Sequence, residues 1–302
     1  MVRGLVHKRF VSFDGTEIAY QVRGEGPPVV LANGLGGTFE AFRHVYRALG
    51  DAYRIVCWDY RGLYGSGRPR DLATLAIASQ CRDLAILLDK EKIDRAVLVG
   101  WSMGVQVNFE LCRHHRDRVA GIVAVNGTYG SPFRSALASR LARYLIPPWL
   151  SVMKAQAPLV SRVSHATVAW SGLIPAMARL GLVSTRIDED AMRAVAEGFK
   201  GMDFAIYSDT LRALGAHDAR DLLPHLDAPT LIIAGDRDLM TPLFTARKMN
   251  RWIRGSRLVV IPGATHYAPL EFPEVIEAEI LGFLGGIRGW EPRCPQVTPT
   301  GP

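Results

Sequence analysis

The chain has 302 residues, of which 48% are hydrophobic, and a formal net charge of +7 at pH 7. This length is enough for one large hydrophobic core, or for a core with a smaller lobe. No run of about 18 apolar residues without a charge occurs, which excludes a membrane-spanning helix.

The first residues carry no apolar signal region and no small-residue cleavage site, so we expect a cytoplasmic protein. The chain has four cysteines without Cys-x-x-Cys spacing, which indicates neither a zinc knuckle nor a redox pair. It also lacks a His-x-Glu-x-x-His type pattern and a dinucleotide fingerprint. We therefore predict no metal and no cofactor.

The first hundred residues alternate between strand and helix patterns. Residues 11–23 alternate in polarity around Asp14-Gly15, which predicts two antiparallel strands. Residues 28–32 form an apolar run typical of a buried strand. Further elements are expected as helix at 39–49, strand at 53–58 and helix at 74–90.

A glycine-rich loop, Asn-Gly-Leu-Gly-Gly, follows the buried strand at residues 33–37. It lacks the Lys-Ser/Thr ending of a phosphate-binding P-loop and the spacing of a dinucleotide fingerprint. Its other use is to bring one backbone N–H group close to a reacting oxygen.

The pentapeptide Gly-Trp-Ser-Met-Gly at residues 100–104 lies between an apolar run at 96–99 and a helical pattern at 105–112. The small flanking residues allow a sharp strand-to-helix turn that presents Ser102 in a strained conformation. A serine there lies at a helix N-terminus, where unpaired N–H groups stabilise negative charge. Ser102 is thus a candidate nucleophile, although the pentapeptide alone also fits a serine helix cap.

After a predicted strand at 119–125 the alternation stops until about residue 214. Helical segments replace it, and Asp188-Glu189-Asp190 is expected to open one of them. The other segments are expected to break at Pro147-Pro148, Pro158, Pro175 and Gly181. We predict that residues 129–217 form an inserted helical cap.

The stretch from Ser131 to Ile187 within the cap holds essentially the whole net charge. Between Ser131 and Ile187 there is no Asp or Glu, and the basic residues are Arg134, Arg140, Arg143, Lys154, Arg162, Arg179 and Arg186. Apolar residues separate them and no nucleic-acid-binding motif is present, so we expect no nucleic-acid partner. An apolar surface with scattered arginines suits weak association with an anionic membrane surface, or acyl substrates.

Strand and helix patterns then resume as strand at 229–234, helix at 242–252, strand at 257–261 and helix at 273–284. Repeated strand–helix units predict a mostly parallel sheet with helices on both faces. The core is therefore expected to comprise residues 1–128 and 218–286. Residues 287–302 are rich in proline and are expected to form a disordered tail.

In a sheet of this kind, the chemistry gathers at the carboxyl ends of the strands. Gly-Asp-Arg-Asp at 235–238 follows the next-to-last strand, and Gly-Ala-Thr-His at 263–266 follows the last. The order of Ser102, an aspartate and His266 is the one expected when a nucleophile elbow supplies the serine. The order alone leaves Asp236 and Asp238 open as the acid.

Five ordered motifs together resemble the α/β-hydrolase fold superfamily, in particular its esterase- and lipase-like members with a helical cap. The motifs lie at residues 33–37, 59–62, 100–104, 235–242 and 263–266. The resemblance covers about residues 10–285, and it implies a mostly parallel central sheet flanked by helices.

The resemblance also implies roles. Ser102 is the expected nucleophile and His266 its base. The family pattern Gly-x-x-Asp-x-x-x-Pro makes Asp238 the acid that orients His266, which leaves Asp236 as a turn residue. The backbone N–H groups of Leu35 and Met103 are the expected oxyanion hole.

Two positions depart from the family pattern. Asn33 stands where members usually have histidine, and Tyr64 replaces the second glycine of the motif Asp-x-Arg-Gly-x-Gly-x-Ser. Neither change removes a catalytic atom. The residues that we consider as substrate contacts are Asn33, Tyr64, Trp101, Trp149 and Trp170.

A serine at the elbow implies acyl transfer to water in this superfamily, with ester hydrolysis as the first expectation. Aromatic and aliphatic cap residues favour a small-molecule ester with a hydrophobic or lipid-like acyl group, although most of them are expected to pack the cap against the core. Three alternatives stay open: a C–C bond hydrolase, a cofactor-free haloperoxidase-like enzyme, and a small-molecule receptor on the same fold.

Overall fold

Eight strands form one sheet in the order β1-β2-β4-β3-β5-β6-β7-β8 in the computed structural model, which describes residues 4–134 and 141–290. The strands are β1 (Val6–Val11), β2 (Glu17–Arg23), β3 (Pro28–Ala32), β4 (Arg54–Trp58), β5 (Ala96–Trp101), β6 (Val119–Val125), β7 (Thr230–Gly235) and β8 (Arg257–Ile261). Pairing is antiparallel between β1, β2 and β4, and parallel from β4 to β8.

Both faces of the central strands are apolar. In β5, Ala96 and Leu98 belong to one hydrophobic cluster, whereas Val97 and Val99 belong to the cluster on the opposite face. Because successive side chains of a strand point to opposite faces, an unbroken apolar run is what a doubly covered sheet requires.

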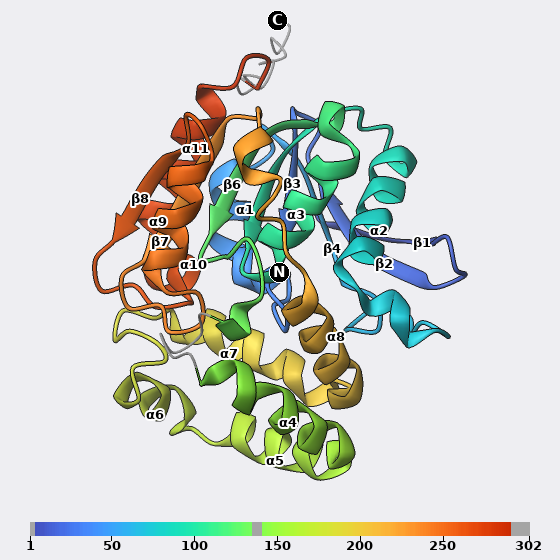
Figure 1. Cartoon of the computed structure of the whole chain (residues 1–302), viewed down its shortest axis with the longest axis vertical. Helices are drawn as coiled ribbons and strands as arrows, with labels where there is room; N and C mark the ends of the chain where they lie inside the picture. Colours follow the sequence, from blue (N-terminus) through green and yellow to red (C-terminus); the bar gives the residue numbers. More distant parts are fainter. Residues whose placement is uncertain (1–3, 135–140, 291–302) are drawn as a thin grey trace, which may run out of the picture.

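Helices cover the two faces. The core helices are α1 (Arg43–Leu49), α2 (Ile77–Lys90), α3 (Met103–His114), α9 (Leu243–Trp252), α10 (Ala268–Glu271) and α11 (Pro273–Gly285). Helices α2, α3 and α9 pack in one hydrophobic cluster, and α1 and α11 in the other (Figure 1). The predicted α/β architecture is confirmed.

The first strand of the sheet lies outside the range that the sequence predicted. The sequence predicted the hairpin within residues 11–23, but β1 spans Val6–Val11 and meets that range only at Val11. Five of its six residues are exposed at the edge of the sheet. An edge strand without a buried face carries no clear polarity alternation. Its sequence therefore did not indicate a strand.

We call residues 129–217 the cap, as the sequence predicted it. Its helices are α4 (Ala142–Ala155), α5 (Ala157–Ala169), α6 (Leu173–Arg179), α7 (Glu189–Gly198) and α8 (Phe204–Ala216). A β-bridge between Gly130 and Asp218 joins the two ends of the insertion. Helices α4, α5 and α6 lie at the end of the molecule farthest from the sheet (Figure 1). No described helix is long and apolar enough to cross a membrane.

One of the breaks that the sequence predicted in the cap helices is absent. The expected break at Pro147-Pro148 is wrong, because both residues lie inside α4. Leu150, one turn later, is fully buried, and such packing offsets the hydrogen bonds that the prolines remove. The expected breaks at Pro158, Pro175 and Gly181 are confirmed. Pro158 and Pro175 lie in the first turns of α5 and α6, where the N–H groups have no helical partner, and α6 ends two residues before Gly181.

The first four residues of the expected disordered tail, 287–290, contradict the prediction. Ile287 and Trp290 are both buried, and the Trp290 Nε1–H group donates to the Pro28 carbonyl oxygen at 2.9 Å. Burial of two large apolar side chains holds this segment on the core. The rest of the predicted tail, residues 291–302, lies outside the described residues.

Candidate active site

Ser102 lies in a sharp turn between β5 and α3. Its backbone has φ 54° and ψ −113°, a conformation that costs energy for any residue with a Cβ atom. A Cβ atom on Gly104 would lie 2.0 Å from the Ala32 carbonyl oxygen, and one on Gly100 would lie 2.7 Å from the Gly104 backbone. The flanking glycines are therefore required by close backbone contacts, as the motif predicted.

Two backbone N–H groups are free beside this serine. Met103 is the first residue of α3, where no helical partner exists, and Leu35 lies in the turn closed by the Gly37 N–H group and the Gly34 carbonyl at 2.9 Å. Neither N–H group donates a hydrogen bond to another described residue. A Cβ atom on Gly34 would lie 3.2 Å from the Ser102 Cβ atom, so this turn lies against the serine.

Two tyrosine hydroxyl groups bond to residues 33–37, which we call the oxyanion loop after its predicted role. The Tyr60 hydroxyl donates to the Asn33 carbonyl oxygen at 2.6 Å, and the Tyr64 hydroxyl donates to the Gly36 carbonyl oxygen at 2.5 Å. Asn33 is 2% exposed, and its Nδ2 atom lies 3.2 Å from the Cys57 sulfur. Neither Asn33 nor Tyr64 lines the cavity described below, so both support the loop.

Asp238 and His266 lie in contact at the carboxyl ends of β7 and β8. The His266 Nδ1 atom is 2.8 Å from Asp238 Oδ2. The other carboxylate oxygen accepts from the N–H groups of Met240 and Thr241, both at 2.8 Å. The Thr241 hydroxyl and the Asn126 amide donate to Oδ2, both at 2.7 Å. This network fixes the carboxylate that faces the imidazole.

The charge state of Asp238 follows from these contacts. Burial alone would raise the pKa of its carboxyl group. The nearby His266 ring and the hydrogen bonds from His266, Asn126 and Thr241 outweigh burial and lower the pKa to about 2. Asp238 is therefore ionised at neutral pH and can stabilise a protonated His266.

Asp236, the alternative acid, lies elsewhere in the same turn. Its Oδ1 atom accepts from the Gly263 N–H group at 2.7 Å and so links the loops after β7 and β8. A Cβ atom on Gly235 would lie 2.2 Å from the Ala264 carbonyl oxygen, which shows how closely these loops pack. The turn role predicted for Asp236 matches this placement.

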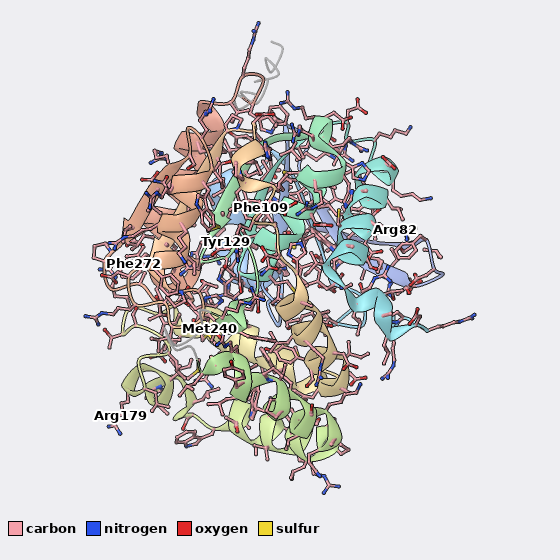
Figure 2. All side chains as sticks on the ribbon, in the orientation of Figure 1. Arg82, Phe109, Tyr129, Arg179, Met240 and Phe272 are labelled. Carbon is pink, nitrogen blue, oxygen red and sulfur yellow. The ribbon has the colours of Figure 1, made fainter. Side chains whose placement is uncertain are left out.

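Ser102 and His266 open onto one cavity of about 350 Å³ between the sheet and the cap. Its apolar wall includes Phe133, Ile146, Trp149, Phe199, Leu211 and Met240. Figure 2 shows Met240 at the junction of the two layers. None of the described residues that line the cavity is Asp, Glu, Lys or Arg.

Only two of the three tryptophans predicted as substrate contacts line the cavity. Trp101 and Trp149 line the cavity, and Trp170 does not. The Trp101 Nε1–H group donates to the His266 carbonyl oxygen at 2.9 Å, so Trp101 also holds the histidine loop. Among the described residues, no group of three or more His, Cys, Asp or Glu side chains is placed to bind a metal ion.

Comparison with known families agrees with this geometry. A family model described as alpha/beta hydrolase fold matches residues 27–273, which include both glycine turns and the three predicted triad residues. The chain belongs to the alpha/beta hydrolase fold family.

Several relatives of this alpha/beta hydrolase are enzymes by name. A pimeloyl-[acyl-carrier protein] methyl ester esterase of Vibrio vulnificus is 27% identical over 89% of this chain and 99% of its own length. A proposed non-heme chloroperoxidase of Synechocystis sp. is 30% identical over 89% of this chain and 95% of its own. The crystal structure of an enol-lactonase from Burkholderia xenovorans superposes with a TM-score of 0.74 at 25% identity, covering 92% and 99% of the two chains.

Sequence reasoning missed two groups of residues in this hydrolase. Asn126, with φ 43°, donates to both Asp238 and the Thr265 carbonyl oxygen, the latter at 2.9 Å. Its position directly after the buried strand β6 was an available signal, because polar residues there lie at the edge that carries the site. The cavity wall from α8, such as Leu211, carried no comparable signal.

Replacing Tyr64 with phenylalanine is expected to lower kcat of the hydrolase about five- to tenfold and to leave KM unchanged. The change removes one hydrogen bond that holds the oxyanion loop, worth about 1 kcal/mol, and leaves the cavity wall intact. Steady-state kinetics on a soluble ester measure both constants. Tyr20→Phe is the matched control, since it removes a buried hydroxyl bonded to Glu91 away from the cavity. Equal losses in the two variants would contradict this role.

Proposed function

We propose that this hydrolase cleaves carboxylic esters with neutral, hydrophobic acyl groups through an acyl-enzyme on Ser102. One observation carries the proposal: the strained Ser102 and His266, which Asp238 holds from behind, open onto the same apolar cavity. The esterase among its relatives supports an ester as substrate.

In the proposed mechanism, Ser102 Oγ attacks the ester carbonyl carbon while His266 accepts the hydroxyl proton. The N–H groups of Leu35 and Met103 stabilise the negative oxygen that forms. His266 then returns the proton to the leaving alcohol, and the C–O bond breaks. Water repeats the sequence on the acyl-enzyme and releases the acid. The ionised Asp238 stabilises the imidazolium at each stage.

The cavity wall also restricts the acyl group. Because no described lining residue is Asp, Glu, Lys or Arg, a charged acyl group would be buried without a partner. Each apolar methylene, by contrast, gains about 0.8 kcal/mol when it leaves water. The proposed substrates are therefore uncharged in their acyl part.

A panel of p-nitrophenyl esters tests this proposal. We expect kcat/KM for the octanoate to exceed that for the acetate by at least about tenfold, because the longer chain fills the apolar cavity. The matched control is the p-nitrophenyl monoester of octanedioic acid, which has the same chain length and a terminal carboxylate. It is expected to react at least about 100-fold more slowly than the octanoate. Acetate preferred over octanoate would contradict the hydrophobic acyl group.

The same panel separates the alternatives. A protein inert on every ester would direct attention to C–C substrates, or to ligand binding without turnover. Peroxide-dependent oxidation of halide in acetate buffer would support the haloperoxidase-like alternative, which the chloroperoxidase relative favours. That activity uses the same serine, so Ser102→Ala is expected to remove it as well.

A further inference from the structure

The cap exposes an unusual amount of apolar surface. Among the described residues, eleven large hydrophobic side chains are more than half exposed, and nine of them lie between residues 141 and 180. The other two, Val6 and Val11, lie on the edge strand β1. Exposed apolar side chains gathered on one part of a protein mark a surface that another molecule covers.

These residues follow helical spacing on α4 and α5. Leu141, at the N-cap of α4, is four residues before Leu145, and Val152 follows seven residues later; each is at least 61% exposed. The opposite side of α4 is buried through Ala142 and Leu150. On α5, Leu159 and Val163 are one turn apart, and both are 56% exposed. Each helix therefore has an outward apolar stripe besides its inward one.

The cations of the same region are partly unpaired. Arg143, Arg162 and Arg179 are exposed and have no carboxylate partner among the described residues. Figure 2 shows Arg179 pointing away from the molecule at the outer margin of the cap. The segment from 131 to 187 itself has no Asp or Glu, and Lys154 on α4 is paired with Asp209 from α8.

We propose that this apolar and cationic cap face, carried by α4, α5 and the end of α6, docks on anionic lipid bilayers. Helices that lie in a membrane interface combine apolar side chains with arginines in this way. Anionic headgroups complement the unpaired guanidinium groups. A second copy of this chain is disfavoured as the occupant, because it would bring like charges together.

The docking face continues to the mouth of the cavity. Trp149 on α4 is 54% exposed and also lines the cavity that holds Ser102. A bilayer on this face lies next to the cavity entrance. If the proposed ester hydrolysis holds, lipid-like esters enter the cavity from the bilayer side; the docking itself does not depend on that step.

Vesicle flotation of the full chain tests the docking. We expect at least tenfold tighter partition onto vesicles of phosphatidylcholine with 30% phosphatidylglycerol than onto phosphatidylcholine alone. Raising the salt to 0.5 M is expected to weaken the binding, because it screens exposed charges. Two cap variants, Leu145→Glu/Val163→Glu and Arg162→Gln/Arg179→Gln, are each expected to lose about tenfold or more in partition.

Matched changes outside the cap are the controls. Val6→Glu/Val11→Glu alters two side chains that are 52% and 63% exposed on β1, and Arg251→Gln/Arg254→Gln removes two exposed cations at and just after the end of α9, so each control changes the net charge as much as the cap variants do. Both control variants are expected to bind vesicles like the unchanged chain. None of the substituted residues lines the cavity, so turnover of a soluble ester should stay the same in all variants.

Three results would overturn the proposal. The first is equal binding to neutral and anionic vesicles. The second is an equal loss of binding in the cap and control variants, which would indicate a response to net charge alone. The third is a dimer in solution that the Leu145→Glu/Val163→Glu variant dissociates, without vesicle binding by the unchanged chain. Vesicle binding is measured without turnover. The docking proposal is therefore tested even if the protein is inactive on every ester.

Discussion

Replacing Ser102 with alanine is expected to lower kcat/KM on p-nitrophenyl octanoate by about 10³-fold or more. The variant lacks the oxygen that attacks the ester, and no acyl-enzyme can form on it. The residual rate then comes from the Leu35 and Met103 N–H groups and from the cavity, which still bind and polarise the ester. Steady-state kinetics and the loss of the p-nitrophenol burst measure the two effects.

The geometry of the site supplies a matched pair of controls for this result. Asp238→Asn removes the ionised partner of His266 and is expected to cost a comparable factor. Asp236→Asn changes a residue in the same turn whose side chain bonds only the Gly263 N–H group among the described residues, and it should keep activity within about threefold. If the serine variant retains a tenth or more of the activity, Ser102 is not the nucleophile.

Replacing Arg61 with methionine is expected to lower the free energy of unfolding by about 3–5 kcal/mol. Arg61 is fully buried, and its guanidinium contacts Asp83 Oδ2 at 2.8 Å and Oδ1 at 2.6 Å. A third contact joins it to Asp14 Oδ2 at 2.7 Å. Without Arg61, the Asp83 carboxylate would be left buried with the Ser12 hydroxyl as its remaining partner among the described residues.

Burial explains why this loss is large. Burial already raises the pKa of Asp83, although Arg61 and Ser12 act in the opposite direction. Removing Arg61 leaves the burial cost of the carboxylate almost unopposed. Urea denaturation, monitored by circular dichroism at pH 7, measures the change.

A second variant separates the buried charge from lost packing. Arg61→Met/Asp83→Leu replaces both charges with apolar side chains and is expected to recover most of the stability. Arg116→Met, which breaks an exposed ion pair with Asp227, is expected to shift the midpoint within experimental error. If the double variant is no more stable than Arg61→Met, the unpaired carboxylate is not the cause.

Local pattern predicted well the elements that carry an apolar run or a helical apolar period. β6 and β8 have the predicted bounds, and α9 and α11 differ from the prediction by one residue. The strands carry an unbroken apolar run, and the apolar residues of the helices recur with the helical period. Both signals come from residues close together in the chain. The prediction failed at β1, where His-Lys-Arg interrupts the apolar residues, and at Pro147-Pro148, where distant packing overrides the local pattern.

The predicted catalytic residues depend on motifs, and their roles stay predictions until the variants are measured. Ser102 and Asp238 each follow a glycine that has no room for a side chain, and the turn before His266 contains Gly263 with φ 80°, so all three turns require glycines that the sequence shows. Trp149 and Trp170 looked alike in the sequence, yet only Trp149 lines the cavity. Which of two cap tryptophans faces inward depends on how the cap packs on the core.

The amino-acid order thus determines the strand–helix alternation, the tight turns and the position of an inserted helical segment, because these depend on residues close together in the chain. Only the tertiary structure shows that Asn126 bonds to Asp238 and that Arg61 pairs with Asp83. It also forms the cavity beneath the cap, whose described lining includes no Asp, Glu, Lys or Arg. These contacts join residues from 22 to 112 positions apart. Such distant pairs form through the packing of whole elements, which no local pattern encodes.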